Sequence, residues 1–156
     1  MVNEEKNNLS INILDLLKQK ILVIDGAMGT MLQKNGLKSG ECPELWNITH
    51  PEVVKQIHTS YLEAGADIIL TNTFGANGIK LLKLKQQDKL QEINRQAVIL
   101  AKEAADNFRK KYFEPVFVAG SVGPTGEILE PIGPLKSSEA YQGYQDQIKE
   151  MVSAGV

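Results

Sequence analysis

The sequence predicts an α/β protein whose core is a parallel β-sheet built from repeated βαβ units. Three short apolar runs have the composition of strands that are buried on both faces: residues 21–24, 67–70 and 116–119. The segments between them carry apolar residues at helical spacing. The units recur at similar intervals, since Ile24, Ile69 and Val118 stand 45 and 49 residues apart. Strands that alternate with amphipathic helices in this way indicate a parallel sheet.

The bulk composition narrows the class of partner. The chain has 156 residues, of which 42% are hydrophobic and 23% charged, and its formal net charge is −2. Neither nucleic acid nor a membrane surface is therefore an expected partner. No apolar run approaches the roughly 18 residues of a membrane span, and the polar N-terminus lacks a signal core. The single cysteine, Cys42, excludes an internal disulfide framework. We expect a cytoplasmic protein.

Residues 1–20 are expected to form an N-terminal extension that ends in a short helix. In "LSINILDLLKQK" the apolar residues recur at helical spacing behind Ser10, a candidate N-cap. Residues 21–156 would then hold the strand–helix units, starting with a strand at 21–24.

The helix between the first two strands is expected within residues 49–66. Thr49 as N-cap with Glu52 three residues later has the pattern of a capping box, and Gly65 is placed to end the helix. Its expected apolar stripe contains Val53, Val54, Ile57, Tyr61 and Leu62.

Two more helices complete the pattern, one within residues 87–108 and one from about Ser138. The first is expected to bury a stripe of Leu90, Ile93, Ala97, Leu100 and Ala104. The second is expected to bury a stripe of Tyr141, Tyr144, Ile148, Met151 and Val152.

The chain ends with "MVSAGV", which resembles "YLEAGAD", the stretch where the chain passes from a helix into the second strand. In both, an Ala-Gly pair follows the expected helix. A fourth strand would therefore begin directly after Val156. We expect the chain to be cut before that strand.

Small polar residues follow each apolar run, where the carboxyl ends of parallel strands meet at one rim. Asp25 follows the first run, Asn72 and Thr73 follow the second, and Ser121 follows the third. These side chains are expected to converge on one binding site.

Four stretches, in this order, resemble the homocysteine-binding domain of homocysteine S-methyltransferases: "DGAMGTMLQ", "ELWNITHPEVVKQIHTSYLEAGADIILTNTFGAN", "INRQAV…AKEAA" and "VAGSVGPTGEILEP". The resemblance covers about residues 21–156 and is strongest to the N-terminal module of cobalamin-dependent methionine synthases. It implies a TIM barrel of eight βα units. This chain would hold the first three, preceded by the short N-terminal helix.

What the resemblance implies is a zinc enzyme that methylates the thiol of homocysteine to give methionine. A free thiol has a pKa near ~8.5 and is mostly protonated at neutral pH, whereas a metal-bound thiol is deprotonated. The implied methyl donor is methylcobalamin, recharged from methyltetrahydrofolate by downstream modules. In other relatives the donor is a betaine or a sulfonium.

The zinc ligands of that family are cysteines in the later barrel units, which this chain lacks. We therefore assign no catalytic and no metal-binding residue, and we expect the chain alone to be inactive. Cys42, His50 and His58 are present, but their spacing matches no zinc signature. They are expected to be a loop thiol, a solvated residue and a partly packed helical residue.

The resemblance gives Asp25 and Gly26 roles in binding homocysteine. Asp25 would hold the amino group, although its carboxylate could instead cap the following turn. Gly26, with Gly29 nearby, would let the backbone approach the ligand, or would be a plain turn residue.

The residues after the second and third runs have roles of the same kind. Asn72 and Thr73 would line the amino-acid pocket, or would only form hydrogen bonds within their loop. Gly120 and Ser121 in "GSVGPTG" would bind the carboxylate through small side chains and free N–H groups. The alternative is a tight turn stabilised by Pro124.

Two other functions remain open at this point. The chain could belong to a different TIM-barrel enzyme that binds a phosphorylated or other anionic substrate with "GAMGT" or "GPTG", although it has no Walker motif. It could also be a non-catalytic half-barrel that pairs with another chain.

Overall fold

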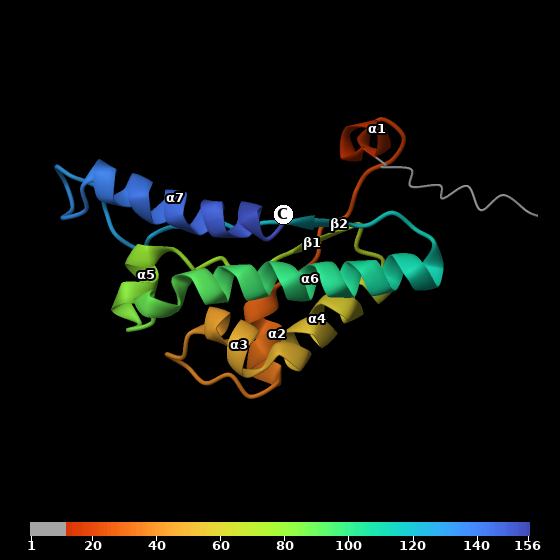
Figure 1. Cartoon of the computed structure of the whole chain (residues 1–156), viewed down its shortest axis with the longest axis horizontal. Helices are drawn as coiled ribbons and strands as arrows, with labels where there is room; N and C mark the ends of the chain where they lie inside the picture. The colour runs from red at the N-terminus through yellow and green to blue at the C-terminus, as the bar shows by residue number, and fades with distance from the viewer. Residues whose placement is uncertain (1–11) are drawn as a thin grey trace, which may run out of the picture.

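The computed structural model describes residues 12–156 as an α/β arrangement of helices around a short parallel sheet (Figure 1). The order of elements is α1 (Ile13–Leu17), α2 (Met28–Lys34), η1 (Pro43–Leu45), α3 (Trp46–Thr49), α4 (Pro51–Glu63), β1 (Ile68–Leu70), α5 (Gly78–Lys83), η2 (Gln87–Lys89), α6 (Leu90–Tyr112), β2 (Phe117–Ala119) and α7 (Ser137–Ser153). The α2 and α3 helices were not among the expected elements. The proposed Ser10 cap lies outside the described residues, and Asn12 caps α1 instead.

The sheet confirms the parallel topology for the second and third runs. β1 and β2 pair in parallel, with Ile68 opposite Phe117 and Leu70 opposite Ala119. The first run is shorter than expected and forms only one parallel bridge, between Ile24 and Ile68. It lies at the edge of the sheet next to β1. Val23 and Ile24 are more than half exposed, so this run is not buried on both faces as its composition suggested.

Helices α4 and α6 pack together against the strands, as Figure 1 shows for the long α6 helix running beside β1 and β2. One core cluster lies where α4, α6 and the sheet meet. It consists of Leu62, Ala66, Ile69, Ala101, Ala104, Ala105 and Val116. The α6 side of this cluster is made of alanines, which let the helix approach α4 and the sheet closely. A second cluster packs α2 and α3 onto α4 through Leu32, Leu37, Trp46, Val54, Ile57 and Leu100.

Helices α4 and α7 end in the same way, as the similarity of their C-terminal sequences predicted. Gly65 has a φ of +99° and Gly155 a φ of +95°. In each case the N–H groups of the glycine and of the next residue donate to carbonyls of the last helical turn. These donors are Gly65 and Ala66 after α4, and Gly155 and Val156 after α7. Glycine suits this position because a left-handed backbone strains residues that carry a Cβ.

The predicted capping box of α4 is wrong. The helix begins at Pro51, its cap position is His50, and no side chain caps it. Thr49 instead ends α3, where its hydroxyl donates to the Leu45 carbonyl. Proline explains the shift, because it lacks an N–H group and its fixed φ suits the first helical position.

The predicted buried face of α7 is largely wrong. Tyr141, Ile148 and Val152 are exposed, although Met151 is buried as expected. The buried face contains Ala140, Gly143, Gln147, Glu150 and Met151. The small residues on this face allow α7 to pack against α5 and α6, and Ile79 of α5 lies directly against Gly143. Along the described residues, no helix combines the length and apolar character needed to cross a membrane.

Candidate functional site

A cavity of about 620 Å³ lies at the carboxyl ends of the first run and β1, beside the loop that follows β2. Its walls come from loops, from the start of α2, from the end of β1 and from α5. The lining residues are Asp25, Gly26, Ala27, Met28, Gly29, Gly40, Glu41, Pro43, Glu44, Leu70, Thr71, Asn72, Phe74, Lys80, Leu84 and Ser121. We call it the rim cavity. Four of the six residues expected to bind a substrate line it, namely Asp25, Gly26, Asn72 and Ser121.

Asp25 is held by one carboxylate oxygen only. Its Oδ2 accepts a hydrogen bond from the Leu70 N–H at 3.0 Å. Its Oδ1 is buried, and no group within residues 12–156 donates to it. Burial raises the pKa of this carboxyl above its ordinary value, and the Leu70 hydrogen bond opposes that rise. A donor that reached Oδ1 would satisfy an acceptor that is now shielded from water.

Gly26 is required by packing as well as by its place in the cavity wall. A Cβ at this position would lie 2.9 Å from Cε1 of the Tyr61 ring, which leaves no room for a methyl group. The Tyr61 hydroxyl donates to the Ala27 carbonyl at 3.1 Å. The Tyr61 ring therefore packs against the turn of "DGAMG".

Asn72 fastens its loop to the segment that precedes α4. Its Nδ2 donates to the Pro43 carbonyl at 2.9 Å and to Asn47 Oδ1 at 3.0 Å. Glu44 also joins the two segments, since its Oε1 accepts a hydrogen bond from the Gly75 N–H at 2.6 Å. Together these bonds hold "CPELWN" against "TNTFGAN" and form one wall of the rim cavity.

Thr73 and Gly120 do not line the rim cavity. Thr73 is fully buried beneath it, where its hydroxyl donates to the Ser121 carbonyl at 2.7 Å and its own carbonyl accepts from Gln147 Nε2 at 2.7 Å. Gly120 adjoins α7, and a Cβ there would lie 3.3 Å from the Met151 side chain. Both positions link the strand ends to α7.

Two backbone N–H groups of "GSVGPTG" are already engaged inside the protein. The Ser121 N–H donates to Thr71 Oγ1 at 3.0 Å, and the Gly123 N–H donates to the Phe74 carbonyl at 3.0 Å. Pro124 has no N–H group. Ser121 is the residue of this loop that lines the rim cavity, so its hydroxyl is the donor that the loop presents there.

Glu44, Phe74 and Lys80 are among the lining residues that sequence reasoning did not predict. The signal for Lys80 was Asn77, whose Oδ1 accepts from the Lys80 N–H at 3.0 Å and so starts α5 at Gly78. A cap at Asn77 places Lys80 in the first turn, beside the loop that follows β1. Glu44 had no comparable signal, because its carboxylate is buried only by the folding of two distant loops together.

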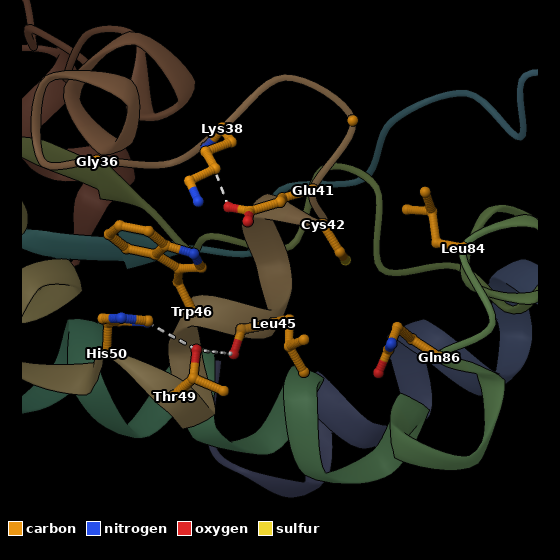
Figure 2. A pocket seen from close by; sticks show the side chains of 11 residues that line it. Gly36, Lys38, Glu41, Cys42, Leu45, Trp46, Thr49, His50, Leu84 and Gln86 are labelled. Carbon is orange, nitrogen blue, oxygen red and sulfur yellow. Dashed lines mark hydrogen bonds between the residues drawn. The ribbon is translucent and has the colours of Figure 1, made fainter.

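A second cavity of about 540 Å³ lies on the other side of the "GECPELW" segment (Figure 2). In it the Trp46 and His50 rings are stacked with centroids 4.1 Å apart, and His50 Nδ1 lies 2.8 Å from the Thr49 hydroxyl. The Cys42 side chain is apart from these rings in Figure 2. Burial, followed by the nearby Glu44 carboxylate, raises the pKa of the Cys42 thiol to about 11.

The described residues do not form a zinc site. Within residues 12–156 no three histidine, cysteine, aspartate or glutamate side chains are grouped so that they could hold a metal ion. His58 is fully buried in α4, and not partly packed as expected, whereas His50 is exposed. A thiol with a raised pKa is also a poor metal ligand, because a metal binds the thiolate.

Comparison with known proteins gives one family. The family model described as homocysteine S-methyltransferase matches residues 22–156. Methionine synthase of Mycobacterium tuberculosis (strain ATCC 25618 / H37Rv) is 33% identical over a 165-residue alignment that covers 99% of this chain and 13% of that protein. Methionine synthase of Mycobacterium leprae (strain TN) is 34% identical over 154 residues, covering 92% and 12%. The chain thus spans about an eighth of the length of these relatives.

Solved structures give the same result. The metallated form of the homocysteine methyltransferase MmuM from Escherichia coli is 25% identical and matches with a TM-score of 0.75, covering 91% of this chain and 54% of that one. Its apo form is 28% identical and matches with a TM-score of 0.65, covering 90% and 48%.

Proposed function

The chain belongs to the homocysteine S-methyltransferase family, and on this premise we propose that the rim cavity binds homocysteine for methylation of its thiol to methionine. We also propose that residues 21–156 form the first three βα units of a TIM barrel, with residues 1–20 as an extension. The match to a solved homocysteine methyltransferase with a TM-score of 0.75 supports the coarser statement that the chain is part of that fold.

The observation that carries the proposal is the carboxylate oxygen of Asp25, Oδ1, that has no hydrogen-bond donor among the described residues. An α-amino acid brings an ammonium group that must be paired when it leaves water. Asp25 offers it a carboxylate oxygen that accepts no hydrogen bond from the described residues. A charge-assisted hydrogen bond of this kind contributes roughly 1.5–3 kcal/mol. Gly26, Asn72 and Ser121 would complete the wall around the amino acid.

The cofactors implied by the family do not find ligands among these residues. A bound zinc ion would supply a thiolate by deprotonating the homocysteine thiol. Since residues 12–156 offer no metal cluster, the part of the reaction that we assign to this chain is binding and orienting the amino acid. Methylcobalamin and methyltetrahydrofolate, as donor and its source, remain predictions from the family resemblance.

A calorimetric titration of the chain with homocysteine tests the proposal. Homocysteine is expected to bind more tightly than 4-sulfanylbutanoate, which keeps the thiol and carboxylate but lacks the ammonium group. The expected ratio is roughly 10- to 150-fold, since 1.4 kcal/mol corresponds to tenfold. Equal affinities, or no binding of homocysteine, would contradict the proposal.

A further inference from the structure

We propose that Lys80 recognises the carboxylate of the amino acid and thereby sets its orientation in the rim cavity. This inference rests on the proposed function. It concerns a residue that neither the expected site nor the family resemblance indicated.

The backbone places Lys80 at the cavity wall. Asn77 caps α5, which positions Lys80 in the first turn of that helix, next to the loop that follows β1. The aliphatic part of its side chain runs close to Gly75, where an added Cβ would lie 3.1 Å from Lys80 Cδ. The half-buried side chain is thus packed along its stem, and Lys80 is one of the residues that line the rim cavity.

The charge distribution of the lining makes Lys80 distinctive. Asp25, Glu41 and Glu44 contribute three carboxyl groups to the rim cavity, and Lys80 contributes the one cationic side chain of that lining. A ligand carboxylate would be repelled by the acidic residues and attracted to the lysine. An amino acid would therefore bind with its ammonium group toward Asp25 and its carboxylate toward Lys80.

The Lys80 ammonium group is also available. Within residues 12–156 it forms no ion pair, in contrast to Lys83 one turn later, which pairs with Glu127. Its nearest identified interaction is with the Phe74 ring, whose centroid lies 5.7 Å from Nζ. A cation–π contact of that length leaves the three N–H donors free.

Two N–H groups of the loop after β2 are engaged inside the protein. The N–H groups of Ser121 and Gly123, which could otherwise bind a carboxylate, donate to Thr71 and Phe74 inside the protein. Lys80 is the cationic donor at this cavity that is not engaged in that way.

The test combines Lys80→Met with two truncated ligands. Methionine keeps the unbranched stem of lysine but removes the charge. Lys80→Met is expected to weaken homocysteine and 4-sulfanylbutanoate binding roughly 5- to 50-fold. It should leave 3-aminopropane-1-thiol, which lacks the carboxylate, unaffected. Lys80→Arg should largely retain homocysteine binding. Lys89→Met, in the exposed η2 turn, is the matched control and should bind all three ligands like the unchanged chain.

The outcomes separate this inference from the function on which it rests. If the unchanged chain does not bind homocysteine, the proposed function fails and the role of Lys80 fails with it. If homocysteine binds but Lys80→Met binds it equally well, the function stands and the inference is wrong. An equal loss for homocysteine and 3-aminopropane-1-thiol would show a structural role instead, and would also overturn it. Should Lys80→Met lose its helical circular dichroism signal, Lys80→Gln takes its place in the same comparison.

Discussion

Asn47 of α3 and Asn72 of the loop after β1 are joined by two hydrogen bonds. Asn72 Nδ2 donates to Asn47 Oδ1 at 3.0 Å, and Asn47 Nδ2 donates to the Asn72 carbonyl at 2.9 Å. Both side chains are buried. The pair joins the segment before α4 to the loop after β1, and so maintains one wall of the rim cavity.

Asn47→Ala is expected to lower the free energy of unfolding by about 2–4 kcal/mol. The substitution leaves the amide and carbonyl of Asn72 short of partners in a buried place, where each unsatisfied group costs about 1–3 kcal/mol. Urea unfolding measures the change. Asn107→Ala, on the exposed side of α6, is the control and should change stability by less than about 0.5 kcal/mol. If Asn47→Ala also lowers the free energy of unfolding by less than about 0.5 kcal/mol, the hydrogen bonds between Asn47 and Asn72 do not stabilise the chain as proposed.

Asp25→Asn is expected to weaken homocysteine binding without lowering the stability of the chain. Homocysteine affinity should fall roughly 10- to 150-fold, because the variant keeps the shape of the side chain and loses its charge. Stability at pH 7 should not fall, because burial raises the pKa of Asp25 and so disfavours the ionised side chain in the folded state. Calorimetric titration and urea unfolding give the two values. Unchanged homocysteine affinity would reduce Asp25 to a residue that stabilises its turn.

His58 is expected to make the protein less stable in weak acid. Its ring is fully buried, neither ring nitrogen has a hydrogen-bond partner among the described residues, and burial lowers its pKa to about 4. An unfolded histidine has a pKa of about 6.5. Between these values the unfolded state binds more protons, so stability falls as the pH drops from about 6.5 to about 4, by about 3 kcal/mol in total.

His58→Leu should remove that part of the acid destabilisation. The measurement is the free energy of unfolding at several pH values, with His50→Gln as the control because His50 is exposed. The control should keep the slope of the unchanged chain. A His58→Leu variant with the same slope would place the acid sensitivity in other residues.

The two glycines of "DGAMG" are expected to respond differently to alanine. Gly26→Ala would push a methyl group into the Tyr61 ring and should cost about 1–3 kcal/mol of stability. Gly29 lies inside α2 with no atom within 4 Å of an added Cβ, so Gly29→Ala should be neutral or stabilising by up to about 1 kcal/mol. Thermal unfolding of both variants checks this. Equal effects would mean that Tyr61 moves aside without cost.

The exposed edge of the sheet is expected to promote self-association. Ile21 is 90% exposed, and the adjoining run 23–24 pairs with β1 on one side only. Ile21→Lys should shift the chain toward monomer in analytical ultracentrifugation. Phe113→Lys is the control, because Phe113 is equally exposed but ends α6 away from this edge. A control that dissociates equally, or an unchanged chain that is already monomeric, would contradict the prediction.

Local pattern was sufficient for much of the fold. The runs at 67–70 and 116–119 become β1 and β2, and the apolar stripe of α6 is buried at Ile93, Ala97 and Leu100. These elements follow from the spacing of residues within one segment, which the sequence contains. The first run is the exception, because burial of a strand depends on neighbours that its own composition does not describe.

For the candidate site, local pattern was enough to show which residues follow the strands, and the motifs were enough to indicate the family. The direction in which each of these side chains points could be seen only in the folded chain. Asn72 turns toward Asn47, Thr73 turns inward toward α7, and Lys80 reaches the rim cavity. The physical reason is that a loop has no repeating geometry, so its side chains are oriented by hydrogen-bond partners that lie dozens of residues away in the chain.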